Sequence, residues 1–256
     1  MSDATEGHDS VRVAAAGDIH VREANAEQVG RAFRAIAPDV DLILLAGDLT
    51  THGEPGQAAF LADACKGLEL PPVAAVLGNH DHHCARAQEL TGALEEAGIT
   101  VLDRSSRVYE IRGVEVGVVG AKGFVGGFAG SHLPDFGEPL LRQVYRETSD
   151  EVEAIRAGLV AVAHCPVRIV LLHYAPVEDT LAGEPPGIHT FLGSSRLADP
   201  IREHEPDLVL HGHAHAGSFE GSIGPDPVYN VSVRVMKRDF WVFELKAEER
   251  AAPPIH

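Results

Sequence analysis

Apolar runs and helical patterns alternate along the first hundred residues. The runs at residues 11–16, 41–46 and 73–77 predict buried strands, and apolar residues at helical spacing predict helices over 25–37, 54–66 and 84–97. Because a helical pattern follows each predicted strand, the order indicates parallel strands joined by crossover connections. In such a sheet the carboxyl ends of the strands lie along one edge.

The pattern changes after residue 98. Residues 99–102, 107–111 and 114–119 read as short strands joined by tight turns, which predicts antiparallel pairing among them. Residues 120–137 form a glycine-rich loop in which Phe124 and Phe128 look exposed. The loop is too long for a simple connection, so it is a candidate for lining a substrate pocket.

The second half of the chain returns to longer elements. We expect helices over 138–163 and 194–203, strands over 168–172 and 207–210, and a final antiparallel pair formed by 227–233 and 239–245. The sequence contains no internal repeat or linker. It therefore predicts a single domain over residues 11–246, between a disordered N-terminal tail at 1–10 and a frayed C-terminal tail at 247–256.

Composition narrows the classes of function. No apolar run approaches the roughly 18 residues that a membrane span needs, and the polar N-terminus lacks the features of a secretory signal, so we expect a cytoplasmic protein. The three cysteines, Cys65, Cys84 and Cys165, are widely spaced, which argues against a disulfide framework or a cysteine-based zinc site. The net charge of −17 opposes general attraction to nucleic acid, and a small-molecule partner is expected instead.

Polar residues follow five of the predicted strands. They are Asp18 and His20, Asp48, Asn79 and His80, His173, and His213 and His215. Taken one at a time, each has a plainer interpretation as a turn, a helix cap or a core histidine. Together, oxygen and imidazole ligands suit Mn, Fe or Zn, and seven ligands suit two ions better than one. Asp48 is the candidate for a carboxylate that bridges the two ions.

The ordered series resembles the motifs of the calcineurin-like metallophosphoesterase superfamily. The residues that carry the resemblance are Asp18-x-His20, Gly47-Asp48, Gly78-Asn79-His80-Asp81, His173 and Gly212-His213-x-His215. The resemblance implies an α/β fold, a four-layer α/β-β/α sandwich of two mixed sheets flanked by helices. It also implies a dinuclear metal site at the strand ends.

Each motif position implies a role. Asp18, His20 and His215 would hold the first metal ion, Asn79, His173 and His213 the second, and Asp48 would bridge them. His80 would not bind metal; it would stabilise the transition state or protonate the leaving oxygen. Asp81, where many members have glutamate, would orient the His80 ring.

The implied function is a metal-dependent phosphoric ester hydrolase. Hydroxide bridging the two metals would attack a phosphomonoester or phosphodiester of a small molecule, a nucleotide being one candidate. A nuclease would need a basic groove, and a non-catalytic scaffold protein on this fold would lack motif histidines that are present here. Residues left open as pocket, outer-sphere or surface groups are His82, His83, His211, Lys122, His132 and His189, the last three in loops 120–137 and 174–193.

Overall fold

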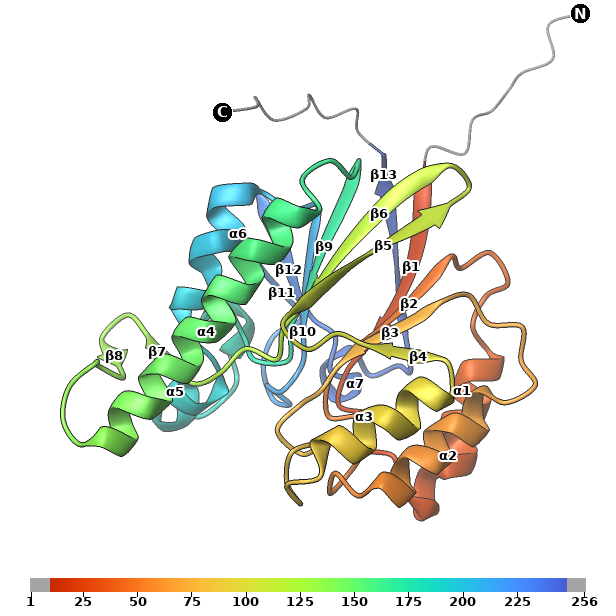
Figure 1. Ribbon diagram of the computed structural model, residues 1–256, viewed down its shortest axis with the longest axis horizontal. Helices are drawn as coiled ribbons and strands as arrows, with labels where there is room; N and C mark the ends of the chain where they lie inside the picture. The colour runs from red at the N-terminus through yellow and green to blue at the C-terminus, as the bar shows by residue number, and fades with distance from the viewer. Residues whose placement is uncertain (1–9, 248–256) are drawn as a thin grey trace, which may run out of the picture.

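Two mixed β-sheets form the centre of the computed structural model, which describes residues 10–247 (Figure 1). The strands of the first sheet, in spatial order, are β13 (Trp241–Lys246), β1 (Ser10–Ala16), β2 (Leu42–Ala46), β3 (Val73–Val76) and β4 (Ile99–Val101). Strands β1 to β4 run parallel, and β13 pairs antiparallel with β1. The predicted crossovers from strand to strand are confirmed.

The second sheet has six strands in the described part of the chain. In spatial order they are β11 (Glu220–Ile223), β12 (Asp226–Asn230), β10 (Leu208–His211), β9 (Val167–Leu171), β6 (Val114–Gly120) and β5 (Ser105–Ile111). Its four central strands are parallel, and the edge strands β11 and β5 are antiparallel to their neighbours. The polar residues after β9 and β10 therefore lie at one edge of this sheet.

Helices cover the outer faces of both sheets (Figure 1). α1 (Ala26–Arg34), α2 (Pro55–Cys65) and α3 (Ala87–Glu96) lie on the first sheet, and α4 (Pro139–Ala161) and α6 (Ala198–His204) lie on the second. The shorter elements are η1 (Glu23–Asn25), β7 (Gly127–Phe128), β8 (Ser131–His132), η2 (Asp179–Leu181), η3 (Pro186–Ile188), α5 (His189–Leu192), η4 (Ser195–Leu197) and α7 (Val233–Met236). The predicted fold class, two mixed sheets flanked by helices, is confirmed.

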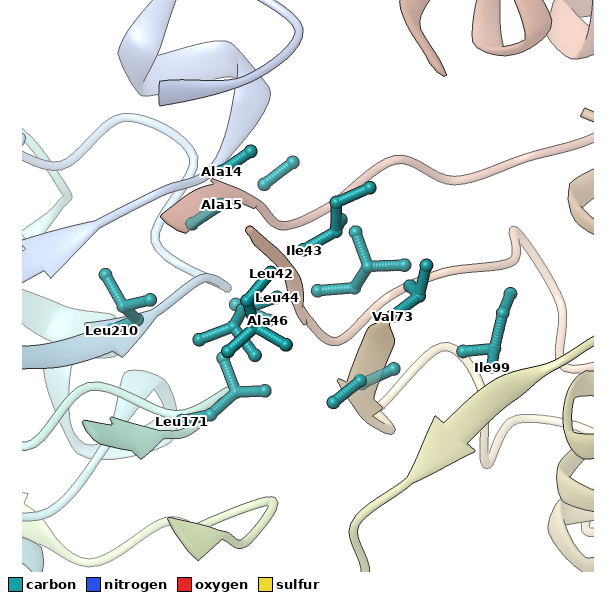
Figure 2. Close-up of a cluster of buried hydrophobic side chains, with 14 of the residues drawn as sticks. Ala14, Ala15, Leu42, Ile43, Leu44, Ala46, Val73, Ile99, Leu171 and Leu210 are labelled. Carbon is teal, nitrogen blue, oxygen red and sulfur yellow. The ribbon is translucent and has the colours of Figure 1, made fainter. Parts of the chain in front are cut away.

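The core lies between the sheets. Leu171 and Leu210 of the second sheet face Leu42 and Leu44 of the first (Figure 2), and all four side chains are fully buried. The residue before Leu171, Val170, belongs to a separate cluster beneath α4 and α6. Because successive residues of a strand point to opposite faces, strands covered on both sides need unbroken apolar runs. This requirement explains the apolar runs that the sequence shows at the central strands.

Two predicted strand pairings are wrong. Residues 99–101 do not pair with the hairpin that follows; helix α3 carries them back to the first sheet, where they extend its edge parallel to β3. The two C-terminal strands do not pair with each other either. β12 lies parallel to β10 in the second sheet and β13 antiparallel to β1 in the first. Partner choice depends on which apolar edge remains uncovered, and this is a non-local property.

The loop over residues 120–137 is also more ordered than expected. Its middle forms the two-stranded ribbon of β7 and β8, and the Phe128 side chain is 4% exposed. Phe128 packs in a small apolar cluster with Leu181 and Leu192, so its expected exposure is wrong. Phe124 is half-buried against the cluster beneath α4.

The predicted tails, residues 1–10 and 247–256, lie outside the described residues except for Ser10, which begins β1, and Ala247. Every helix within residues 10–247 is too short or too polar to cross a membrane.

Truncating a side chain between the sheets should destabilise the fold strongly. We expect Leu44→Ala to lower the free energy of unfolding by about 2–5 kcal/mol, because it leaves a cavity that neither sheet can fill. The matched control is Val160→Ala on α4, where the side chain is 58% exposed and the expected change is within about 0.5 kcal/mol. Urea denaturation measures both. Equal effects at the two positions would contradict the assigned core.

Candidate metal centre

The ends of β1, β2 and β3 of the first sheet meet the ends of β9 and β10 of the second. Each strand is followed by a candidate ligand, and the described residues contain two groups of side chains whose ligand atoms lie within 4.8 Å of one another. The first group is Asp18, His20, Asp48 and His215; the second is Asp48, His173 and His213. Asp48 belongs to both groups.

Imidazole and carboxylate atoms converge in the first group. His215 Nε2 lies 2.9 Å from Asp18 Oδ1 and 3.5 Å from His20 Nε2. The fourth member of the group is Asp48, whose Oδ2 lies 3.7 Å from His20 Nε2. Two carboxylates and two imidazoles around one point form a donor set suited to a divalent transition metal.

The second group gathers around the other oxygen of Asp48. His173 Nε2 lies 3.4 Å from Asp48 Oδ1 and 2.9 Å from Asn79 Oδ1. Asp48 thus directs one oxygen to each group, as a bridging carboxylate would. The donors on both sides are of the type that divalent transition metals accept, so the residues fit such ions.

Main-chain carbonyls fix the tautomers of two histidines. Nδ1 of His173 lies 2.9 Å from the Ala46 carbonyl, and Nε2 of His213 lies 3.2 Å from the Phe191 carbonyl. A carbonyl oxygen only accepts, so these nitrogens carry the protons. The lone pairs left for metal are on Nε2 of His173 and Nδ1 of His213. Such contacts orient a ligand ring and keep it basic.

Burial keeps the His20 and His213 imidazoles neutral and therefore able to bind metal. It lowers the pKa of His20 to about 4 and that of His213 to about 3. Burial would raise the pKa of Asp18, but the hydrogen bond from His215 and the nearby histidines lower it below its usual value. The same hydrogen bond raises the pKa of His215. Burial raises the pKa of Asp48, a cost that bound cations would offset.

Four candidate ligands have left-handed backbone conformations. The φ angles are 58° at Asp18, 47° at His20, 49° at Asp48 and 69° at His213. Non-glycine residues rarely adopt this region, which costs about 1–2 kcal/mol for a side chain with a Cβ atom. The chain turns sharply at each strand end, and the turn directs the side chain toward the other sheet. Strain of this kind is concentrated at functional sites.

Two motif glycines allow the strand ends to approach each other. Gly47 has a φ of 78°, and a Cβ atom there would lie 2.5 Å from His173 Nδ1. A Cβ atom at Gly78 would overlap the carboxylate of Asp48. The second sheet could not place His173 beside Asp48 if either position carried a side chain.

His80 and Asp81 have separate roles in the geometry. The His80 ring lies beside that of His20, with centroids 4.6 Å apart, and its Nδ1 lies 2.9 Å from the Thr51 carbonyl. Among the described residues, Thr51 and not Asp81 orients this ring, which corrects the role expected for Asp81. The Asp81 carboxylate is fully buried and accepts hydrogen bonds at 2.7–3.0 Å from Leu49, Thr50 and Gly78.

The remaining candidates divide between interior and surface. His211 is fully buried, donating from Nδ1 to the Gly212 carbonyl and accepting from the Thr180 hydroxyl. His82, His83 and His132 are exposed. His189 contacts Glu178 at 3.1 Å. Lys122 lies over the rings of Phe124 and Tyr174, and Tyr174 in turn packs 4.5 Å from the His213 ring.

The main-chain partners Ala46, Thr51 and Phe191 were not identified from the sequence. Each acts through a carbonyl oxygen, which every residue possesses, so the sequence carries no signal for them. Thr50, whose hydroxyl and amide both donate to Asp81, was not identified from the sequence either.

Comparison with known proteins places this geometry in a class. The family described as calcineurin-like phosphoesterase matches residues 11–217. That span covers most of the chain and every candidate ligand, so the protein belongs to the calcineurin-like phosphoesterase family. It is accordingly a metal-dependent phosphoester hydrolase. No curated protein sequence gives a significant match.

Solved structures share the fold at low sequence identity. Phosphopantetheinyl hydrolase from Mycobacterium tuberculosis is 16% identical, with a TM-score of 0.69 over 96% of this chain and 99% of its own. GAP50, described as the anchor in the inner membrane complex of Plasmodium, is 14% identical, with a TM-score of 0.62 over 93% and 81%. A putative 5'-nucleotidase from Staphylococcus aureus is 14% identical, with a TM-score of 0.56 over 96% and 56%.

The left-handed backbone at His20 predicts an unusual order of stabilities. At ordinary positions alanine stabilises a protein over glycine by about 0.4–1 kcal/mol. In metal-free protein, we expect His20→Gly to be at least as stable as His20→Ala, because glycine removes the strain. Thermal unfolding measures the difference. The control pair is His82→Gly and His82→Ala, at an exposed position outside the left-handed residues, where alanine should be the more stable. If the alanine variant is more stable than the glycine variant by the same amount at both positions, the assigned backbone strain is refuted.

Replacing Asp81 tests its role as an anchor. An asparagine side chain in its place could not accept all the bonds that the carboxylate accepts, since the amide nitrogen would face main-chain N–H donors. We expect Asp81→Asn to cost about 1–3 kcal/mol for each unpaired donor and to weaken metal binding by displacing Asp48 and Asn79. Urea denaturation and metal titration measure the two effects. A variant with unchanged stability and weakened turnover alone would instead support a direct role at the His80 ring.

Proposed function

We propose that the protein hydrolyses phosphomonoester or phosphodiester bonds of a small molecule with the help of two divalent metal ions. The observation that carries the proposal is the position of Asp48, which directs Oδ2 to one group of ligands and Oδ1 to the other. The first ion would be held by Asp18, His20 and His215, the second by Asn79, His173 and His213. Mn, Fe and Zn all accept this donor set.

Bound in this way, two cations would activate the attacking water and neutralise charge on the phosphoryl oxygens. The residues of the chain supply orientation. Asp18 accepts the amide N–H of His213 at 3.0 Å, which ties the end of β1 to the loop that follows β10. The ligands are therefore held before substrate arrives, and little reorganisation is needed during the reaction.

His80 is proposed as the group that assists the leaving oxygen. Its Nδ1 is committed to the Thr51 carbonyl, so Nε2 is the nitrogen available to substrate. In the proposed step His80 acts as an imidazolium, with a proton on each ring nitrogen. The water oxygen gives up a proton and forms a bond to phosphorus, and the bond from phosphorus to the leaving oxygen breaks. That oxygen takes the proton from Nε2, which leaves a neutral His80 ring. A positioned acid of this kind accelerates a reaction by about 10²–10⁴-fold.

The two alternatives predict different behaviour. A nuclease would cleave polynucleotides faster than small esters, and the net charge of −17 argues against it. A scaffold protein would bind no metal and hydrolyse nothing; the fold does occur in an anchor protein, GAP50. The complete set of candidate ligands supports the enzyme over the scaffold.

Substitutions in the 79–80 pair should separate metal binding from catalysis. We expect His80→Ala to lower turnover of an aryl phosphate and an aryl phosphodiester by about 10²–10⁴-fold while leaving the metal content unchanged. Asn79→Ala should mainly lower occupancy of the second metal. Manganese-loaded protein, metal analysis and steady-state kinetics provide the measurements.

The control for this pair is His132→Ala, which removes an exposed histidine on β8. Its turnover and metal content should match those of the parent protein. Loss of metal from His80→Ala would contradict the division of roles. Full activity in an Asp48→Asn, His80→Ala double variant would refute the mechanism.

A further inference from the structure

A cavity of about 710 Å³ opens beside the first group of candidate ligands. Asp18, His20, His80 and His215 line one end of it, and the cavity extends between α1 and residues 233–240. Pockets for small organic ligands typically measure about 300–1,000 Å³. Since His80 faces this space, the leaving group of a substrate held at the metal centre would occupy it.

The lining of this cavity is mainly basic outside the candidate ligands, and its four cations are called the basic wall. They are Arg22, Arg234, Lys237 and Arg238, whereas Asp239 is the one acidic residue among the described lining outside the ligand Asp18. The whole chain has 38 acidic and 21 basic residues, so an average surface would be mainly acidic. The local reversal of charge indicates a site for an anionic group.

These cations are free to bind a ligand. Within residues 10–247, Arg22, Arg234 and Lys237 make no ion pair, and Arg238 stacks over the Trp241 ring at 4.3 Å. Half of the other basic residues in this range make an ion pair: Arg31, for example, contacts Glu27 at 2.7 Å. Unpaired guanidinium groups on one wall suit a phosphate, which they bind through two parallel hydrogen bonds.

Apolar side chains form another part of the cavity lining. Val29, Ala32 and Phe33 of α1 and Phe240 line the cavity, and the rings of Phe33 and Phe240 are 5.2 Å apart. A cavity lined by candidate metal ligands, cations and apolar side chains fits a substrate whose organic body carries more than one anionic group. A polynucleotide would instead present a phosphate at every step.

The wall is held in place by the main chain. Val231 N donates to the His211 carbonyl at 2.8 Å, and the Val231 carbonyl accepts from Gly17 N at 2.7 Å, so the segment is tied to both sheets. Arg234, Lys237 and Arg238 follow directly. These three residues lie after residue 217, where the match to the family ends, whereas Arg22 lies within the matched region.

We propose that this basic wall binds a second phosphate of the substrate. The preferred substrate would then be a phosphoester whose leaving group consists of an organic body with a further phosphate at its far end. The proposal rests on the proposed function, because it assigns the leaving-group side of that same site. Arg22, Arg234 and Lys237 act in it as specificity residues that bind the distal phosphate.

Matched substrates test the proposal. Manganese-loaded protein is assayed with alkyl monophosphates and with alkanediol bisphosphates that carry one phosphate at each end, over chains of about three to eight carbons. After correction for two equivalent ends, we expect the best bisphosphate to exceed its monophosphate in kcat/KM by about tenfold or more. In Arg234→Gln, Lys237→Gln protein this ratio should fall toward one, mainly through KM. The control Arg31→Gln, which alters a paired arginine on α1, should keep the parent ratio.

A binding measurement provides a readout without turnover. Calorimetry on protein treated with a chelator should show tighter binding of the bisphosphate than of the monophosphate. The difference should shrink with added salt and in the double variant. A preference that is absent at every chain length, or unchanged in the double variant, overturns the proposal.

Two further outcomes are distinct. Faster cleavage of DNA oligonucleotides than of any bisphosphate assigns the wall to a polynucleotide and also overturns the proposal. Failure of the proposed function has a separate signature, since no aryl phosphate would then be hydrolysed by metal-loaded protein. In that case the calorimetric preference alone decides whether the basic wall binds the second phosphate.

Discussion

The arrangement of the centre depends on where the Asp48 carboxylate lies. Its backbone is left-handed, its Oδ1 accepts the N–H of His80 at 2.8 Å, and Gly78 leaves room for it. Asp81 holds the next two residues, Leu49 and Thr50, by their amides. Several weak constraints thus fix one charged group between the two sheets. Each of them acts on the loops that also carry the other ligands, so the ligand groups and the sheet junction form a single unit.

Much of the centre could be predicted from the sequence because its signals are local. A buried strand needs an unbroken apolar run, and a polar residue directly after such a run must lie at the strand end; Asp18, Asp48 and His173 were found in this way. The left-handed conformations at the first two of these positions were not predicted, because non-glycine residues in general rarely adopt that region. The role expected for Asp81 was wrong because adjacency in sequence does not imply contact: the side chains of His80 and Asp81 point to different partners.

The parts of the fold that were mispredicted are those set by distant segments. Residues 99–101 and 226–230 have the composition of strands and form strands in the structure. Their partners depend on which sheet edge the preceding helix or turn reaches, which no short window of sequence contains. The same holds for Phe128, whose burial requires Leu181 and Leu192 from another loop. Element type was therefore easier to predict than pairing or exposure.

In the segment from β12 to β13, hydrogen bonds hold the backbone in place while two basic side chains are exposed. Its main chain at Val231 and Val233 is bonded to Gly17, next to a candidate ligand, whereas the Arg234 and Lys237 side chains are exposed. Substitutions at exposed positions usually change stability by about 0.5 kcal/mol or less. Mutation can therefore alter the wall of the cavity without disturbing the ligands. In evolutionary terms, the lining of this cavity can diverge while the candidate ligands stay unchanged.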